Sequence, residues 1–275
     1  MQETKRNVTN ENDLQRIKEL RLMDDDFFSE ALDGKTEVVE YILSTILERD
    51  DIKVKSTKAQ VEYKNATKRS IKLDIQAEDV NGRLMDIEIQ RSDRGSGVRR
   101  ARFHSSMIDR ALLSKGDDFE DLVDTYVIFI TEKDKFGMGI PLYHIERKIS
   151  EMDNALFGDG AHILYVNGEY RNLEHPVGSL MHDFNCKDAK DMVNPLLAEE
   201  VRYLKETEGG RSQMSRILEE MRNEVAEKAK AEGNHEKAVN TALKMIAKKY
   251  EAEEIAEITG LSLEEVRKLA ENQKG

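Results

Sequence analysis

The hydrophobic residues of the first fifty positions recur at near-helical spacing. One series covers residues 14–22, and a second covers residues 38–46 behind an Asp33-Gly34 break. Apolar residues three and four positions apart form one face of a helix, and a glycine after an aspartate commonly marks a turn. The pattern therefore predicts two helices before the first strand.

From Ile52 onward the period of the hydrophobic pattern changes to two, which predicts β-strands. Helical spacing returns between Val98 and Leu113. We therefore expect helices, a strand meander, a helix and then further strands, all within one α/β domain. The alternating segments lie at residues 52–54, 61–63, 71–90, 125–130, 142–145 and 163–166.

Beyond about Pro195 the pattern changes to long charged helices, with breaks at Glu208-Gly209-Gly210 and at Glu232-Gly233-Asn234. No long strand pattern returns. We expect residues 1–195 to form the α/β domain and residues 196–275 to form a helical extension. An apolar stripe in this extension predicts a helix that packs either on the domain or on a second copy of the chain. We expect a homo-oligomer that forms through these C-terminal helices. The stripe consists of Met214, Ile217, Leu218, Met221 and Val225.

The end of the chain, residues 252–271, resembles a helix-turn-helix. A short helix leads to a turn at Gly260, and Ser262 and Glu265 form a capping box for a second helix. In a DNA-binding helix-turn-helix, the first residues of the second helix contact the edges of the bases. Here these residues include Glu264 and Glu265, whose negative charges the DNA phosphates repel. We therefore favour a helical pair for self-association or docking over DNA reading.

Composition narrows the class of protein. The chain has 275 residues, of which 39% are hydrophobic and 36% charged, and no apolar run approaches the roughly 20 residues that span a bilayer. The polar start of the chain shows no secretory signal, and the single Cys186 excludes an internal disulfide and a cysteine-clustered zinc site. We expect a soluble cytoplasmic protein that makes no contact with membranes. A net charge of −12 means that any nucleic-acid contact comes from a local basic patch.

Such a patch lies in residues 91–110, where six arginines face only two aspartates. A Gly95-Ser96-Gly97 segment leads into the helix that carries most of them. Guanidinium groups there could contact the phosphates of a nucleic acid, and the alternative is a solvated or ion-paired helix face. The candidate nucleic-acid-binding residues are Arg94, Arg99, Arg100 and Arg102.

The alternating segment 71–90 carries polar groups on one face of each of its two strands. In the first strand Ile71, Leu73 and Ile75 form the apolar face, and in the second Met85, Ile87 and Ile89 do so. The opposite faces hold Lys72, Asp74 and Gln76, and Asp86, Glu88 and Gln90.

The length of the turn decides whether these polar faces coincide. A two-residue Asn81-Gly82 loop would set Asp74 against Ile89, a carboxylate among core residues. A three-residue loop with Gly82 in the left-handed conformation instead sets Asp74 against Glu88. The same register places Gln76 opposite Asp86 and Lys72 opposite Gln90.

Directly opposed carboxylates about 4.5–5.5 Å apart repel each other unless a cation or a shared proton lies between them. A hard divalent ion with oxygen ligands resolves this repulsion, and a bound Mg²⁺ supports hydrolysis of a phosphodiester. Asp74 and Glu88 are then the metal ligands, with the carbonyl of Ile89 as a third. Gln90 positions the attacking water, and Lys72 supplies positive charge. The alternative is a pair of strands whose polar faces are simply solvated.

Asp74, thirteen intervening residues and then Ile87-Glu88-Ile89-Gln90 resemble the PD-(D/E)XK nuclease superfamily, and specifically its Rpn branch of recombination-promoting nucleases and putative transposases. That branch has glutamine where most of the superfamily has lysine. The resemblance covers residues 20–175, although no proline precedes Asp74. It extends to a helix with Asp25 and Phe28 ahead of the strands, to Arg100 and Arg102 after them, and to the Lys115-Gly116-Asp117-Asp118-Phe119 segment.

The resemblance implies a restriction-endonuclease-like fold, a mixed central sheet flanked by helices. It also implies Mg²⁺-dependent cleavage of DNA, with Mn²⁺ as a possible substitute. The alternative is a weak or inactive nuclease fold that acts by binding DNA or a partner protein. An RNase H-like transposase fits less well because its carboxylates come from strands well separated in sequence. None of the six histidines has ligand spacing, and neither they nor Cys186 is assigned a role.

Overall fold

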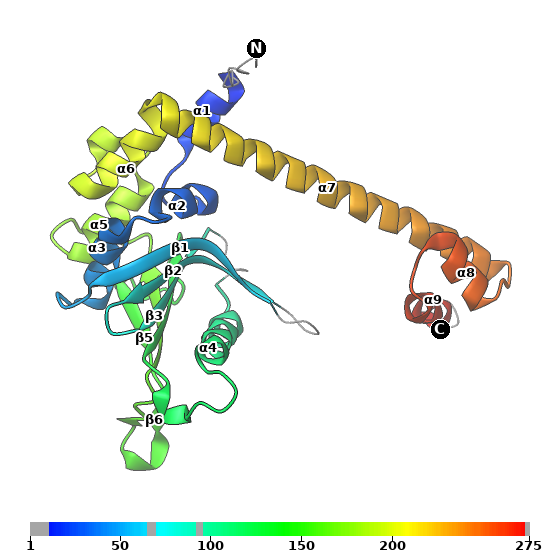
Figure 1. The fold of residues 1–275 in the computed structure, drawn as a ribbon, viewed down its shortest axis with the longest axis horizontal. Coiled ribbons are helices and arrows are strands. Elements are labelled where there is room, and N and C mark those ends of the chain that lie inside the picture. Colours follow the sequence, from blue (N-terminus) through cyan, green and yellow to red (C-terminus); the bar gives the residue numbers. More distant parts are fainter. Residues whose placement is uncertain (1–10, 65–69, 92–95, 273–275) are drawn as a thin grey trace. The chain divides into compact units, whose positions relative to one another are not determined.

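The computed structural model describes residues 11–64, 70–91 and 96–272, and its fold is drawn in Figure 1. The chain divides into two compact units, Met1–Ser215 and Arg216–Gly275. The domain boundary expected from the sequence, between residues 1–195 and 196–275, stays a prediction. It concerns which parts of the chain fold independently.

The first unit is built around a six-stranded mixed sheet in the order β1-β2-β3-β4-β8-β5. The two central pairs, β3 with β4 and β4 with β8, are parallel, and the other pairs are antiparallel. The segments expected at 61–63, 71–90, 125–130, 142–145 and 163–166 lie in this sheet, and residues 54 and 61–63 belong to one strand, so that Ile52 lies just before it. Their bounds are β1 Val54–Tyr63, β2 Ile71–Asp79, β3 Leu84–Gln90, β4 Thr125–Thr131, β5 Leu142–Ile145 and β8 Ala161–Asn167, and a separate hairpin pairs β6 Lys148–Ile149 with β7 Ala155–Leu156.

Helices cover the sheet, which confirms the predicted α/β class (Figure 1). Helices α2 and α3 pack against β1, whereas α4 packs against β4 and β8. The central strand β4 is buried along its whole length, as expected for a parallel strand with both faces covered. The helices are α1 Glu11–Glu19, α2 Asp25–Leu32, α3 Thr36–Leu47, α4 Val98–Leu112, α5 Pro176–Asn185 and α6 Pro195–Glu206, and short 3₁₀ turns occupy Phe119–Asp121, Ser150–Met152 and Ala189–Asp191.

The start of the chain contains a third helix, so the prediction of two helices before β1 was wrong. Helix α1 ends at Glu19, and the eight-residue α2 follows it. A helix this short is marginal by itself and depends on packing. Phe27 and Phe28 of α2 are both fully buried, which supplies that packing. Tertiary burial therefore creates an element that the spacing of residues 14–22 did not reveal.

The second unit consists of the continuation of α7 Glu208–Ala247, together with α8 Ala252–Thr259 and α9 Leu263–Asn272. The turn between the last two is at Gly260, whose φ is +73°, so the predicted helical pair at the end of the chain is present. Both helices pack on the end of α7. The core that they share is formed by Ala242, Ile255, Leu261 and Val266.

The predicted break at Glu232-Gly233-Asn234 was wrong, because α7 is continuous through it. A glycine inside a helix costs about 1 kcal/mol relative to alanine, which is too little to end a helix of good helix formers. The other predicted break, at Glu208-Gly209-Gly210, lies one position earlier, at Thr207. Helix α6 ends at Glu206 and α7 begins at Glu208. At Gly210 a Cβ atom would lie 2.1 Å from the carbonyl oxygen of Tyr203, so only glycine fits this close approach. Within the described residues, no helix is long and apolar enough to cross a membrane.

Candidate metal centre

The turn between β2 and β3 has the three-residue loop that the sequence predicts. Gly82 has a φ of +81°, and the backbones of Asp79 and Arg83 are joined by a 3.1 Å hydrogen bond across the loop. Beyond the loop, Gln76 pairs with Asp86 and Ile75 with Ile87. The predicted register of the hairpin is therefore confirmed over these residues.

The two strands part at Asp74 and Glu88, where side chains replace the backbone ladder. The backbone N–H of Asp74 donates to Glu88 Oε1 at 3.1 Å, and the N–H of Ile89 donates to Asp74 Oδ2 at 3.0 Å. The Asp74 carboxylate thus takes the place of a carbonyl of β2, and the Glu88 carboxylate accepts an N–H that a regular ladder would direct toward β1. This exchange holds both acidic groups in the gap between β2 and β3.

The regular alternation of β2 is interrupted at Asp74. Opposite it, Gln60 of β1 has a φ of +55°, and the β1–β2 pairs on either side leave this position out. Leu73 packs in the core cluster beneath α4, whereas Ile75 pairs with Ile87 on the other face of the sheet. The prediction that Leu73 and Ile75 share one face was therefore wrong, because the chain bends at the acidic residue.

Helix α2 brings a further carboxyl group to Asp74. Asp25, the first residue of α2, forms a side-chain hydrogen bond with Asp74. Burial and the charge of Asp26 raise the pKa of Asp25, while the positive charge of Lys72 opposes that rise. Lys72 is exposed. The charge of Lys72 therefore acts on Asp25. The expected pairing of Lys72 with Gln90 is not among the described β2–β3 pairs, which begin at Ile75 and Ile87.

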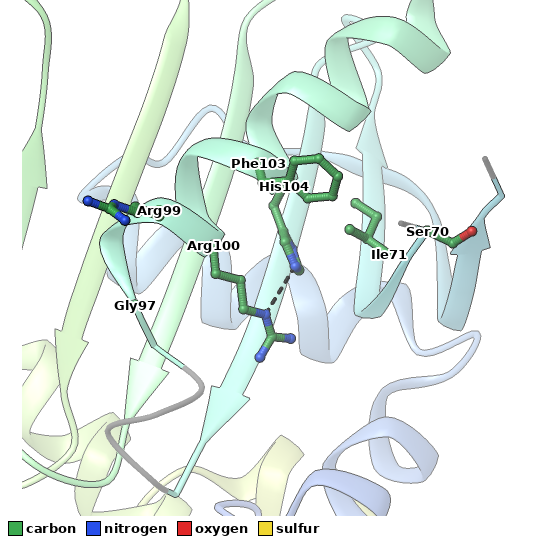
Figure 2. Close-up of a pocket in the computed structure, with 7 residues that line it drawn as sticks. All are labelled: Ser70, Ile71, Gly97, Arg99, Arg100, Phe103 and His104. Atoms are coloured by element: carbon green, nitrogen blue, oxygen red, sulfur yellow. Dashed lines mark hydrogen bonds between the residues drawn. The ribbon is translucent and has the colours of Figure 1, made fainter. Parts of the chain in front are cut away.

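Helix α4 supplies two basic side chains to the same acidic group. Arg100 Nη2 lies 2.6 Å from Glu88 Oε2, and Arg100 Nε donates to His104 Nε2 at 3.2 Å, the bond drawn in Figure 2. His104 Nδ1 lies 2.9 Å from Asp86 Oδ2. Because Nε2 accepts a hydrogen bond, the imidazole proton belongs on Nδ1, where it is donated to Asp86.

The buried setting of Asp74, Asp86 and Glu88 raises the pKa of each carboxyl group and so disfavours its charged form. Burial raises the pKa of Asp74 to about 9, and the charges of Glu88 and Asp25 add to the rise. Burial, followed by the charge of Asp86, raises the pKa of Glu88 to about 8. The pKa of the fully buried Asp86 is also raised well above its usual value, mainly by burial. Such a cluster binds either protons or a cation.

The oxygen donors in the gap fit a hard divalent ion. The carboxylates of Asp74 and Glu88 lie there, and so does the carbonyl of Ile89, because the N–H and C=O of one strand residue point to the same side. Oxygen ligands of this kind suit Mg²⁺ or Mn²⁺. Gln90 stands at the edge of the group, and its Nε2 donates to the carbonyl oxygen of Ile89 at 2.8 Å.

A cleft of about 670 Å³ opens beside these residues (Figure 2). Arg99 and Arg100 line it on one side, with Phe103 between them and the start of β2 at Ile71. Of the other arginines predicted to bind nucleic acid, Arg102 is exposed on α4, and Arg94 lies outside the described residues. The structure therefore brings two of the four predicted arginines to the cleft next to the acidic group.

Sequence reasoning missed the roles of Asp86 and His104. Asp86 was placed on the polar face but given no function, and His104 was set aside as a lone histidine. The available signal was the four-residue spacing of Arg100 and His104, which places them on one face of a helix directly after the acidic strands. Their contact with β3 depends on how α4 packs, so no spacing along the chain predicts it.

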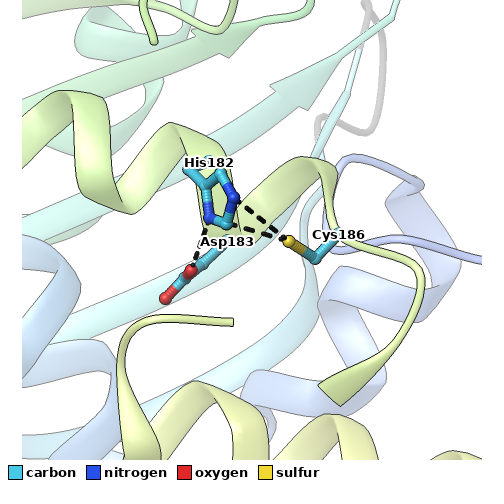
Figure 3. Close-up of side chains that lie close together, drawn as sticks. All are labelled: His182, Asp183 and Cys186. Carbon is cyan, nitrogen blue, oxygen red and sulfur yellow. Dashed lines mark hydrogen bonds and ion pairs between the residues drawn. The ribbon is translucent and has the colours of Figure 1, made fainter. Parts of the chain in front are cut away.

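A second group of potential ligands, His182, Asp183 and Cys186, lies on α5 and at its end (Figure 3). Here the carboxylate of Asp183 already accepts the backbone N–H groups of Val193 and Asn194, each at 2.7 Å. Burial, with the charge of Asp183, raises the pKa of the Cys186 thiol to about 11, which opposes the thiolate form that binds metals. This group therefore holds the segment that leads into α6.

The comparisons agree with the arrangement of the strands. A family model described as PD-(D/E)XK nuclease family transposase matches residues 26–173. The matched region includes β2, β3 and α4, and hence Asp74, Glu88 and Arg100. No curated protein and no solved structure matches the chain.

Proposed function

The chain belongs to the PD-(D/E)XK nuclease family of transposases, and on this premise we propose that it is a Mg²⁺-dependent DNA endonuclease of the Rpn type. The observation that carries the proposal is the opening of the β2–β3 hairpin at Asp74 and Glu88. Two buried carboxylates face one gap there, with the carbonyl of Ile89 beside them. This donor set supports binding of Mg²⁺, with Mn²⁺ as a substitute.

The residues of the hairpin divide the work of phosphodiester hydrolysis. Asp74, Glu88 and the carbonyl of Ile89 would hold the ion. A divalent ion held there polarises a phosphoryl oxygen and lowers the pKa of water. Gln90 carries an amide that can orient a water molecule next to Ile89, and Lys72 supplies positive charge on the side of Asp25.

The arginines of α4 support binding of the DNA backbone. Arg99 and Arg100 line the cleft next to the acidic group, and Arg102 follows on the same helix. Guanidinium groups pair well with phosphate oxygens, and such contacts position a duplex without reading its sequence. Arg94 belongs to this proposed set on sequence grounds alone. A chain with a net charge of −12 needs a local surface of this kind to approach DNA.

Plasmid cleavage tests the proposal directly. Purified protein should nick or linearise supercoiled plasmid in Mg²⁺ or Mn²⁺, and not in EDTA. Asp74→Asn and Glu88→Gln should each lower the rate by a factor on the order of 100 or more, because each removes a charged ligand of the ion. The matched control is Glu78→Gln on the same strand, where Glu78 pairs with the exposed Lys55. Intact plasmid across metals and salt concentrations would reject the proposal.

A second candidate is a nuclease fold that acts through binding. It is favoured by Gln90, which stands where most of the superfamily has lysine and whose amide is engaged with the carbonyl of Ile89. This candidate predicts a gel shift of DNA without cleavage, unchanged in the Asp74→Asn, Glu88→Gln double variant. Cleavage by the wild-type protein that the double variant lacks would exclude it.

A further inference from the structure

The carboxyl group of Asp86 is the least satisfied polar group near the acidic gap. Its side chain is 0% exposed. One oxygen, Oδ2, accepts the hydrogen bond from His104 Nδ1, and the carboxyl group also forms a side-chain hydrogen bond with Glu88, but Oδ1 has no hydrogen-bond partner among the described residues. A buried oxygen without a partner is costly and requires an explanation, such as an ion that the fold is built to hold.

Asp86 lies within a group of three potential ligands. One atom each from Asp86, Glu88 and His104 lie within 4.8 Å of one another, and all three residues are buried. His104 Nδ1 is 2.9 Å from Asp86 Oδ2 and 3.8 Å from Glu88 Oε1. Ligands that surround one ion at about 2.1 Å are themselves roughly 3–4 Å apart, so these separations match a common ion with little movement.

We propose that Asp86, Glu88 and His104 form a second divalent-metal site, which shares Glu88 with the site assigned to Mg²⁺. One imidazole nitrogen and two carboxylates favour a transition metal such as Mn²⁺ over Mg²⁺, since imidazole is a poor ligand for the harder ion. The inference goes beyond the proposed nuclease function. It concerns binding, and it holds whether or not the protein cleaves DNA.

Arg100 supplies positive charge to this group. Its guanidinium contacts Glu88 Oε2, and its Nε donates to His104 Nε2. A metal bound to His104 Nδ1 takes the position of the proton, and the neutral ring then carries its proton on Nε2. That nitrogen can no longer accept from Arg100. The ion and the Arg100 contact with His104 therefore exclude each other, and ion binding leaves Arg100, which lines the cleft, paired with Glu88 alone within this group.

The test uses the full chain without a polyhistidine tag, loaded with Mn²⁺ and measured by electron paramagnetic resonance. Pulsed spectra should show ¹⁴N coupling from a directly bound imidazole, which a site made only of oxygen ligands does not produce. Titration should reach two Mn²⁺ per chain. Mn²⁺ binding to the wild-type protein without imidazole coupling would overturn the inference, and this measurement depends on no variant.

Variants locate the nitrogen. His104→Gln should remove the coupling and one of the two Mn²⁺ ions. The matched control is His162→Gln, since His162 Nδ1 also pairs with a carboxylate, Glu146 Oε1 at 2.8 Å, and its loss should change neither reading. Coupling that persists in His104→Gln would overturn the assignment.

Failure of this inference and failure of the proposed nuclease function give different results. Asp74→Asn should abolish plasmid cleavage and keep the imidazole coupling, because Asp74 is not a ligand of the second site. Coupling without any cleavage by the wild-type protein would reject the nuclease and support the second site. Cleavage of plasmid by the wild-type protein without imidazole coupling would support the nuclease and reject the second metal site.

Discussion

At Asp74 and Glu88, carboxylate oxygens replace the carbonyl oxygens of a β-ladder. Each accepts a backbone N–H from the facing strand, so side-chain hydrogen bonds link the two strands where they part and the backbone ladder ends. The exchange also turns both acidic groups into a buried gap, where Arg100 pairs with Glu88. The same two hydrogen bonds therefore account for the local structure and for its affinity for a cation.

The raised pKa values of these carboxyls make the stability of the metal-free protein depend on pH. The folded state keeps its protons up to pKa values of about 9 for Asp74 and about 8 for Glu88, whereas the unfolded chain loses them near pH 4. Between these limits the folded state binds more protons, so its free energy of unfolding falls as the pH rises.

We therefore expect the melting temperature in EDTA to fall by on the order of 10 °C or more between pH 6 and pH 9, because each group contributes about 1.4 kcal/mol per pH unit below its folded pKa and 1 kcal/mol corresponds to roughly 2–4 °C in a domain of this size. Mg²⁺ should reverse the loss, most strongly at high pH, because the ion replaces the protons. Asp74→Asn should flatten the pH dependence, and Glu78→Gln should leave it unchanged. Thermal unfolding followed by circular dichroism measures all of these. Equal slopes for Asp74→Asn and wild type would contradict the account.

At the scale of elements, the β2–β3 turn decides which side chains meet. The three-residue loop with a left-handed Gly82 sets the pairing of Gln76 with Asp86, and an even-length loop would shift it by one residue and reverse the faces. Helix α4 then brings Arg100 and His104 to that face. The candidate site thus depends on a turn and on a helix that contributes no carboxylate to it.

Two glycine substitutions should have opposite effects on stability. Gly82→Ala should destabilise the protein by about 1–2 kcal/mol, because its φ of +81° is unfavourable for a residue with a Cβ, although the space around it is open. Gly233→Ala should stabilise α7 by about 0.5–1 kcal/mol, since it lies in a helix and a Cβ there meets no atom within 4 Å. Denaturant unfolding of the two variants compares them. A change of the same sign in the free energy of unfolding of both variants would contradict this account of the two glycines.

At the scale of the whole molecule, the middle of α7 is an exposed segment. Val225 is 66% exposed, and the described side chains from Arg222 to Glu232 are all exposed. Isolated helices of this length are marginal in water, so the segment needs either its flanking turns or a partner. Met221 and Val225 continue an apolar stripe there, which supports the proposal that the chain self-associates through its C-terminal helices.

Hydrogen exchange tests that proposal. The amides of residues 222–232 should be protected at high protein concentration and should exchange faster on dilution, as a second copy dissociates. Light scattering should show the same concentration dependence, and Val225→Glu should shift both measurements toward the monomer while leaving the unit 1–215 folded. A monomer at every concentration, with rapid exchange in this segment, would reject self-association through α7.

The sequence by itself determined the strands, the register of the hairpin and the acidic pair. Alternation has a period of two, and the length of the turn permits only one register in which Asp74 and Glu88 meet, so these features are local in the chain. The helical nature of residues 195–272 was also local, although the break expected at Gly233 did not occur because one glycine is a small penalty in a long helix.

Only the tertiary structure decided the packing that stabilises the short helix α2, the bend at Asp74 and the contacts of His104. Phe27 and Phe28 make α2 stable through burial, which depends on distant residues. The bend lets Leu73 pack beneath α4, against strict alternation. His104 and Asp86 are 18 positions apart, and their contact exists because α4 lies over β3. Packing and desolvation act between segments, and a pattern read along one chain does not contain them.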